Sequence, residues 1–278
     1  MSAELIVAAV QLNSSEDKAA NLATIERLVR RAAEAGAQLI VLPEYGNCLG
    51  DRRIMLAEAE PLDGPTAGLL CALAESLQVT LVGGTFCERI AGDDKAHNTC
   101  LVIDPTGAVV AVYRKLHLFD VDLPGRLTYC ESSWLAPGND VVVCRAAGLN
   151  LATAICYDIR FPELFRLFAD RAVDVVAVPA AFTKTTGRDH WELLLRARAV
   201  ENQTYVIAAN QTGRHAALET YGHSVIIDPW GQVLADVGES EGFVTATIST
   251  TRLAEVRAQL PALQHRRFPR ASGDVDRG

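Results

Sequence analysis

The chain has 278 residues, of which 49% are hydrophobic and 22% charged, and its formal net charge is −8. This length and composition are typical of a globular protein with a sizeable core, and the negative charge disfavours binding to nucleic acid or to an anionic membrane. The apolar run at 173–182 is far shorter than the roughly 18 residues that a membrane span needs. The first residues lack the basic segment of a secretory signal, so we expect a cytoplasmic protein.

The first third of the chain alternates strand and helix patterns. Apolar residues at Leu22, Ile25, Leu28 and Val29 have helical spacing, and acidic residues before them and a glycine after them suit the two ends of a helix. Two further apolar runs flank an Asp-Pro-Thr-Gly turn, which predicts a hairpin. The expected elements are strands at 5–12, 38–44 and 79–86, helices at 15–35 and 64–78, and a hairpin at 98–115.

The second half of the chain repeats this plan. The segment "VIDPTGAVVA" (102–111) matches "IIDPWGQVLA" (226–235), with the same turn in the same apolar frame. Two copies of one unit predict two sheets, each with helices on one face. The second set of expected elements is strands at 148–156, 173–182 and 204–211, helices at 162–172 and 190–203, and a hairpin at 223–237.

The strands are apolar almost throughout, so the sheet faces without helices must be buried as well. We therefore predict an α/β fold in which the sheets stack face to face, a four-layer α-β-β-α sandwich. No linker divides the halves, so residues 1–265 are expected to form one domain. Residues 266–278 are expected to be a surface tail or an arm that contacts a partner.

The seven cysteines do not predict a disulfide framework or a metal site, because no two have CxxC spacing. Most lie inside apolar runs and are expected to be small buried hydrophobic residues. Cys156 differs, since it ends an apolar strand and is followed at once by polar residues.

Two other polar side chains also follow apolar strands. Glu44 follows "LIVLP", and Lys115 ends the first hairpin. Ligands of α/β sheets gather at the carboxyl ends of strands, so the three side chains could meet where the sheets join. Each has an ordinary alternative: Glu44 as a helix-capping or surface carboxylate, Lys115 as a solvated lysine, and Cys156 as a core thiol.

As a set, the three residues suffice for acyl transfer. A carboxylate in a dry pocket can deprotonate a thiol, and an ammonium stabilises both the thiolate and the oxyanion formed by its attack on a carbonyl. We therefore expect Cys156 to have a low pKa. Two alternatives remain: a Cys–His hydrolase whose base is His117, His190 or His223, and an α/β interaction module without catalysis.

The segments "LPEY", "YRKLHLFD" and "CYDIRFPE" resemble the Glu, Lys and Cys motifs of the nitrilase (carbon–nitrogen hydrolase) superfamily, in the same order. The resemblance runs from the first strand to about residue 260 and implies the same four-layer sandwich. It also implies that Glu131, in "YCESSWLAPG", holds the lysine, and that the ammonium of Lys115 and the backbone N–H of Tyr157 face the oxyanion.

Within the superfamily, "KLHLFDVDLPG", "HWELLLRARAVENQ", "QTGRH" and "YGHSVIIDPWG" resemble the amidases of the Nit branch. This implies hydrolysis of a terminal carboxamide of a small carboxylate-bearing substrate to acid and ammonia through a thioester on Cys156, without metal or organic cofactor. Deaminated glutathione is the favoured substrate. The alternatives are 2-oxoglutaramate or 2-oxosuccinamate, as for an omega-amidase, and an N-carbamoyl compound.

Three residues near the motifs are expected to bind substrate. Arg160 could hold a substrate carboxylate through its planar guanidinium, or instead form an ion pair with Glu163 or Asp158. Phe182 and Thr183 follow the strand expected to lie next in the sheet and could line the pocket. The resemblance further implies a homodimer or homotetramer that associates through its helical faces, with the segment from Arg252 onward as a candidate to cross the interface.

Overall fold

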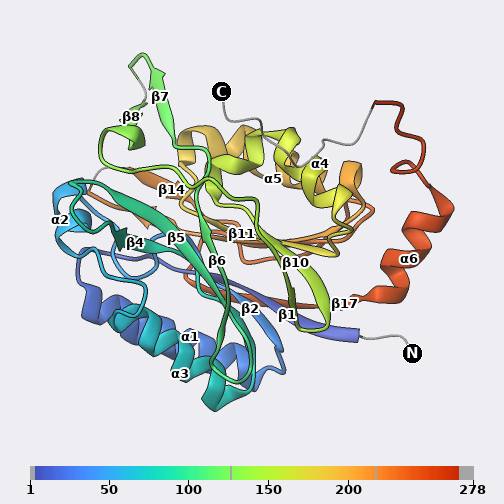
Figure 1. The fold of residues 1–278 in the computed structure, drawn as a ribbon, viewed down its shortest axis with the longest axis horizontal. Helices are drawn as coiled ribbons and strands as arrows, with labels where there is room; N and C mark the ends of the chain where they lie inside the picture. Colours follow the sequence, from blue (N-terminus) through green and yellow to red (C-terminus); the bar gives the residue numbers. More distant parts are fainter. Residues whose placement is uncertain (1–3, 126, 217, 269–278) are drawn as a thin grey trace.

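The computed structural model describes residues 4–125, 127–216 and 218–268. Two β-sheets stack face to face, and helices cover the outer face of each sheet (Figure 1). The sandwich expected from the apolar strands is confirmed.

The first sheet has the strand order β17-β1-β2-β3-β5-β4, and β6 pairs with β5. Helices α1 and α3 cover its outer face (Figure 1), and the short α2 lies near β4. The strands are β1 (Glu4–Gln11), β2 (Leu39–Val41), β3 (Thr80–Val82), β4 (Phe86–Arg89), β5 (Ala96–Ile103), β6 (Val109–Arg114) and β17 (Gly242–Ser249). The helices are α1 (Lys18–Glu34), α2 (Arg52–Ala57) and α3 (Pro65–Leu77).

The second sheet has the order β16-β15-β12-β11-β10-β9 and carries α4 and α5 on its outer face (Figure 1). Its strands are β9 (Val143–Ala146), β10 (Leu149–Thr153), β11 (Val175–Ala180), β12 (Tyr205–Asn210), β15 (Val225–Ile227) and β16 (Val233–Asp236). Its helices are α4 (Pro162–Asp170) and α5 (Lys184–Asn202), and α6 (Thr250–Gln259) follows β17. Two small hairpins are β7 (Asp120–Leu123) with β8 (Leu127–Cys130) and β13 (Thr212–Arg214) with β14 (Glu219–Tyr221).

Strand β1 shows how the layers are held together. Its side chains alternate between the two faces of the sheet: Val7 and Ala9 belong to the core between the sheets, and Ala8 and Val10 belong to the core under α1 and α3. Both faces are therefore dry, which explains why the sequence is apolar without alternation.

The two sheets repeat the same pairing register. In both copies the first strand pair is parallel and the last is antiparallel. The last pair in each copy includes the residue just before the Asp-Pro-x-Gly turn. The equivalent pairs are Ala8–Ile40 and Ala152–Val176, Ile40–Leu81 and Val176–Val206, and Leu81–Ile103 and Val206–Ile227.

The turns themselves are also alike. In each, the Asp side chain accepts hydrogen bonds from the backbone N–H groups two and four residues later, at 2.8 and 3.2 Å for Asp104 and at 2.9 and 2.8 Å for Asp228. The glycines, Gly107 and Gly231, have φ of 79° and 84°, a region that favours glycine. The internal repeat read from the sequence is thus present in the fold.

Several elements differ from expectation. Helix α1 starts at Lys18 because Asp17, and not Ser15, caps it by accepting from the N–H of Ala20. Helix α5 begins at Lys184, six residues earlier than expected, through a Thr- and Gly-containing segment that lacks an apolar period. The unexpected elements are α2, α6, β9, β17, the hairpins β7–β8 and β13–β14, and β4, which shares only Phe86 with the strand expected at 79–86.

Most of the expected tail, 266–278, lies outside the described residues, so the domain limit at residue 265 stays a prediction. Among the described residues, none of the helices combines the length and the apolar character that crossing a membrane requires.

Candidate active site

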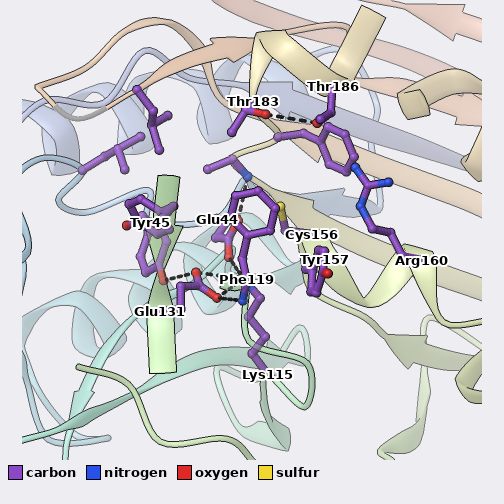
Figure 2. Close-up of a pocket in the computed structure, with 15 residues that line it drawn as sticks. Glu44, Tyr45, Lys115, Phe119, Glu131, Cys156, Tyr157, Arg160, Thr183 and Thr186 are labelled. Atoms are coloured by element: carbon purple, nitrogen blue, oxygen red, sulfur yellow. Dashed lines mark hydrogen bonds and ion pairs between the residues drawn. The ribbon is translucent and has the colours of Figure 1, made fainter. Parts of the chain in front are cut away.

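A cavity lies where strands of both sheets end, and it brings the three predicted residues together (Figure 2). Glu44 follows β2, Lys115 follows β6, and Cys156 follows β10. Each side chain is more than nine-tenths buried. The three side chains thus meet beyond strand ends, as expected: one copy of the repeat brings the carboxylate and the ammonium, and the other brings the thiol.

The ammonium of Lys115 lies between two carboxylates. Its Nζ is 3.0 Å from Glu44 Oε1, and 3.0 and 2.8 Å from the two oxygens of Glu131 (Figure 2). Burial alone would disfavour the charged form, but the negative charges of Glu131 and Glu44 outweigh it and hold the pKa of Lys115 well above its ordinary value. Lys115 is therefore a permanent cation.

Glu44 is fixed at every oxygen. Oε1 accepts from Asn98 Nδ2 at 2.7 Å, Oε2 accepts from the N–H of Ala181 at 2.7 Å, and the backbone C=O accepts from Gln211 Nε2 at 2.9 Å. These donors come from both sheets. The carboxylate therefore keeps one position beside the thiol.

Glu131 is fixed in a similar way. Tyr45 OH donates to it at 3.1 Å, and the N–H of Phe119 donates at 2.7 Å. Burial, only partly offset by Lys115, raises the pKa of Glu131, and burial followed by the charge of Glu131 raises that of Tyr45, whose phenol stays a donor. The expectation that Glu131 lies against the lysine matches this geometry.

The strand expected to end at Cys156 ends at Thr153, and Cys156 starts a single 3₁₀ turn, Cys156–Arg160, three residues further on. Its φ of 45° lies in the left-handed region, which is strained for a residue with a side chain. The first N–H groups of such a turn have no intrahelical acceptor. The N–H of Tyr157, second in the turn, therefore lies beside the thiol as a potential donor.

Asp158, a fully buried carboxylate that the sequence analysis did not assign to the site, holds this turn in place. Its Oδ2 accepts from the N–H of Ile155 at 2.7 Å and from Tyr113 OH at 2.6 Å, and its Oδ1 accepts from the N–H of His117 at 3.1 Å. His117 Nδ1 is also 2.7 Å from Oδ1. Tyr113 and His117 flank Lys115 by two residues on either side, so Asp158 fixes the distance between thiol and ammonium.

The expectation of a low pKa for Cys156 is wrong. Burial, and then the negative charge of Glu44, raise the pKa of the thiol well above its ordinary value, and Lys115 compensates only in part. One ammonium is shared by two carboxylates, so too little positive charge remains to hold a thiolate. The resting thiol is protonated.

Arg160 lines the same cavity and is half-buried. Its guanidinium lies 5.1 Å from the centre of the Phe182 ring and 5.8 Å from that of Tyr157, and it donates to His190 Nδ1 at 3.3 Å. Burial lowers its pKa. Across the described part of the chain it forms no ion pair, so the alternatives of pairing with Glu163 or Asp158 are wrong.

Phe182 and Thr183 both line the cavity, in keeping with their expected place. None of the three candidate histidines is among its described lining residues. His117 contacts Asp158, His190 contacts Arg160, and His223 lies 3.0 Å from Asp236 Oδ2. The Cys–His arrangement is therefore absent from the described cavity wall.

Comparisons with known proteins agree with this geometry. Residues 6–258 match the model of the carbon–nitrogen hydrolase family. A deaminated glutathione amidase of Synechocystis sp. is 45% identical over 267 residues, covering 95% of this chain and 98% of that protein. An omega-amidase of Bos taurus is 39% identical over 262 residues, covering 94% of each. The solved structure of the C. elegans NitFhit protein matches with a TM-score of 0.90 at 35% identity. The match covers 95% of this chain and 65% of that longer protein.

The chain belongs to the carbon–nitrogen hydrolase family. It is a hydrolase that acts on amides, and its resemblance to the Nit branch is confirmed.

Asp158→Asn should lower kcat on an amide substrate by about 100-fold with little change in KM, because a misplaced reacting group costs about that much. The side-chain amide of the variant would place an NH₂ group against hydrogen-bond donors that contact a carboxylate oxygen in the wild type. Steady-state kinetics and thermal unfolding of the variant would check this, since the lost hydrogen bonds should also lower stability by about 1–3 kcal/mol.

Tyr113→Phe is the matched control, because it removes one of the donors to Asp158 and leaves the carboxylate in place. Its kcat should fall by less than about tenfold, in line with one hydrogen bond. An Asp158→Asn enzyme that turns over at the wild-type rate would contradict the positioning role.

Proposed function

We propose that this protein hydrolyses amides of 2-oxo dicarboxylic acids through a thioester on Cys156, and that deaminated glutathione is its preferred substrate. The observation that carries the reaction type is the ammonium of Lys115, 3.0 Å from Glu44 Oε1 and buried beside a protonated thiol. The substrate class rests on Arg160 and on the two named relatives.

In the first step the Cys156 thiol transfers its proton to Glu44 as Sγ attacks the amide carbon. The raised pKa of the thiol supports a transfer that occurs during the attack and not before it. Glu44 is suited to be the base because its backbone and side chain are both held by hydrogen bonds.

The negative charge that develops on the substrate oxygen would meet the Lys115 ammonium and the backbone N–H of Tyr157. Preorganised donors of this kind in a dry site are among the largest contributions to catalysis. Glu131 keeps the ammonium in place and is a positioning residue in this scheme.

The tetrahedral intermediate then loses its amine, which takes the proton held by Glu44, and the acyl group stays on sulfur. A water molecule, deprotonated by the same carboxylate, attacks the thioester. Cys156 leaves as thiolate and recovers the proton from Glu44, so the enzyme returns to its starting state.

The identity of the amine depends on the substrate. Deaminated glutathione carries a 2-oxoglutaryl group joined to cysteinylglycine by an amide, whereas 2-oxoglutaramate carries the same acyl group on ammonia. The ammonia expected from the sequence therefore applies to 2-oxoglutaramate only. Both compounds give the same acyl-enzyme, and both present a carboxylate at the acyl end that Arg160 could bind through its planar guanidinium.

We also propose a homodimer or larger homo-oligomer. Leu193 and Val200 lie seven residues apart on one face of α5 and are 66% and 47% exposed, and Trp230, in the adjacent turn, is 53% exposed. Such an apolar patch is typical of an association surface. The role of the segment from Arg252 onward at an interface and the cytoplasmic location stay predictions.

The test of the proposed function is a comparison of kcat/KM on deaminated glutathione and on 2-oxoglutaramate. We expect hydrolysis of both, with a preference of at least about tenfold for deaminated glutathione, equivalent to 1.4 kcal/mol. Intact-mass analysis should find the 2-oxoglutaryl group on Cys156 after quenching. Cys156→Ala should abolish the hydrolysis of both compounds, and EDTA should leave both hydrolysis rates unchanged.

A clear preference for 2-oxoglutaramate would instead favour an omega-amidase, and activity on neither compound would overturn the proposed substrate class. Inactivation by iodoacetamide through Cys130, the exposed cysteine, with Cys156 unmodified would contradict the assignment of the nucleophile.

Arg160→Ala should lower kcat/KM on both 2-oxo acid amides by roughly 30-fold, since loss of one partner of a buried charged hydrogen bond costs about 2 kcal/mol or more. A neutral amide such as hexanamide should be affected little. Arg160→Lys keeps the charge but not the planar guanidinium, so its kcat/KM on the 2-oxo acid amides should lie between those of wild type and Arg160→Ala. Equal losses on charged and neutral amides would contradict a carboxylate contact.

Light scattering at micromolar concentration should give at least twice the mass of one chain. The double variant Leu193→Asp/Val200→Asp should give a smaller mass, because the new charges would be left unpaired in an apolar interface. Arg30→Asp, a change on the outer helix α1, serves as the control. A wild-type monomer would refute the assembly.

A further inference from the structure

A second hollow opens beside the active-site cavity and shares two of its lining residues, Thr183 and Leu218. In Figure 2, Thr183 lies on the side of the cavity away from Lys115. A molecule whose amide sits at Cys156 can therefore extend past Thr183 into this hollow.

The hollow is formed by the start of α5 and the hairpin β13–β14. The sequence pattern predicted neither this first part of α5 nor the hairpin. Gly187 on α5 lets them pack closely, because a Cβ at this position would lie 2.5 Å from Tyr221 Cβ. The hairpin is also tied to the site, since Gln211, just before it, donates to the C=O of Glu44 at 2.9 Å. The walls of the hollow are thus fixed relative to the reacting groups.

The wall of the hollow is positively charged. Lys184, Arg188 and Arg214 face one carboxylate, that of Glu219. Lys184 Nζ is 2.7 Å from Glu219 Oε1, which leaves Arg188 and Arg214 with no ion pair to any described residue. Arg214 lies directly opposite Glu219 in the hairpin β13–β14, and Arg188 lines the same hollow from α5.

The cavity and the hollow therefore each present a cation. Arg160 lines the cavity and does not line the hollow, whereas Arg188 and Arg214 line the hollow and not the cavity. A substrate that carries one carboxylate on its acyl half and another on its amine half could meet a guanidinium in each of them.

We propose that the hollow lined by Lys184, Arg188 and Arg214 binds the leaving half of the substrate, and that it selects amines that carry a carboxylate. This rests on the proposed function and extends it to the amine side. Cysteinylglycine fits the requirement: its carboxylate is two residues beyond the scissile nitrogen, at most about 7 Å away. Ammonia, the amine of 2-oxoglutaramate, does not reach the hollow at all.

The hollow acts only in the acylation step. Sγ bonds to the carbonyl carbon, the C–N bond breaks, and the amine takes the proton held by Glu44 and leaves through the hollow. The thioester that remains is the same for both substrates, so its hydrolysis is independent of Arg188 and Arg214. Discrimination between the two compounds must therefore appear in kcat/KM.

The experiment measures kcat/KM of wild type, Arg188→Gln, Arg214→Gln and the double variant on three amides of the 2-oxoglutaryl group. Their amines are cysteinylglycine, cysteamine (which lacks the carboxylate) and ammonia. Each single change should lower the ratio of the cysteinylglycine amide to the cysteamine amide by about fivefold, typical of a partly exposed charge contact, and the double change by roughly 20-fold or more. Arg30→Gln, an equal charge change on α1, should leave this ratio as in wild type.

A second measurement uses the reverse direction. With 2-oxoglutaramate as acyl donor, added cysteinylglycine should capture the acyl-enzyme and give deaminated glutathione, whereas the double variant should form at least about tenfold less relative to hydrolysis. Hydroxylamine, a small acceptor, should capture the acyl group equally in wild type and in the double variant.

Equal losses on all three amides, or a ratio as unaffected as in Arg30→Gln, would overturn the inference while leaving the amidase reaction standing. Wild-type enzyme that hydrolyses none of the three would overturn the proposed function, and the inference with it. The two failures are thus distinguishable.

Discussion

The whole site depends on the burial of one ammonium. A lone charge of this kind would cost several kcal/mol to remove from water, and Lys115 is stable inside the protein only because Glu44 and Glu131 both contact it. These carboxylates come from the end of β2 and from the segment after the hairpin β7–β8. The contact with this charge, together with the hydrogen bonds from Asn98 and Ala181, sets the position of Glu44.

A third carboxylate, Asp158, ties the nucleophile to the same strand end. Along residues 113–119, Tyr113 and His117 contact Asp158, whereas Lys115 and Phe119 contact Glu131. The strained turn at Cys156 is therefore held by a group that also fixes Lys115 from both sides. Thiol, ammonium and base are therefore held in fixed relative positions by these contacts, which suits a site whose thiol gives up its proton only on attack.

The sequence was sufficient for the architecture and for the three side chains that meet in the cavity. Apolar runs without alternation required burial of both sheet faces, and polar residues at the ends of such runs had to converge, as Glu44 and Cys156 do. It could not give the pKa of Cys156, which depends on how many carboxylates share the one ammonium. Nor could it give Asp158, whose partners Tyr113 and His117 lie more than 40 residues away, or the hollow by Arg188, which exists only once a hairpin packs on α5.

The repeated register has a consequence for ancestry. Four residues beyond the equivalent positions Ala8 and Ala152 lie Leu12 and Cys156, and four beyond Ile40 and Val176 lie Glu44 and Ala180. The frame is nearly symmetric and the chemistry is not: buried Leu12 and Ala180 stand where a second nucleophile and a second base would be. A half-length progenitor built like either copy would hold the base and the cation, or the nucleophile, and never all three.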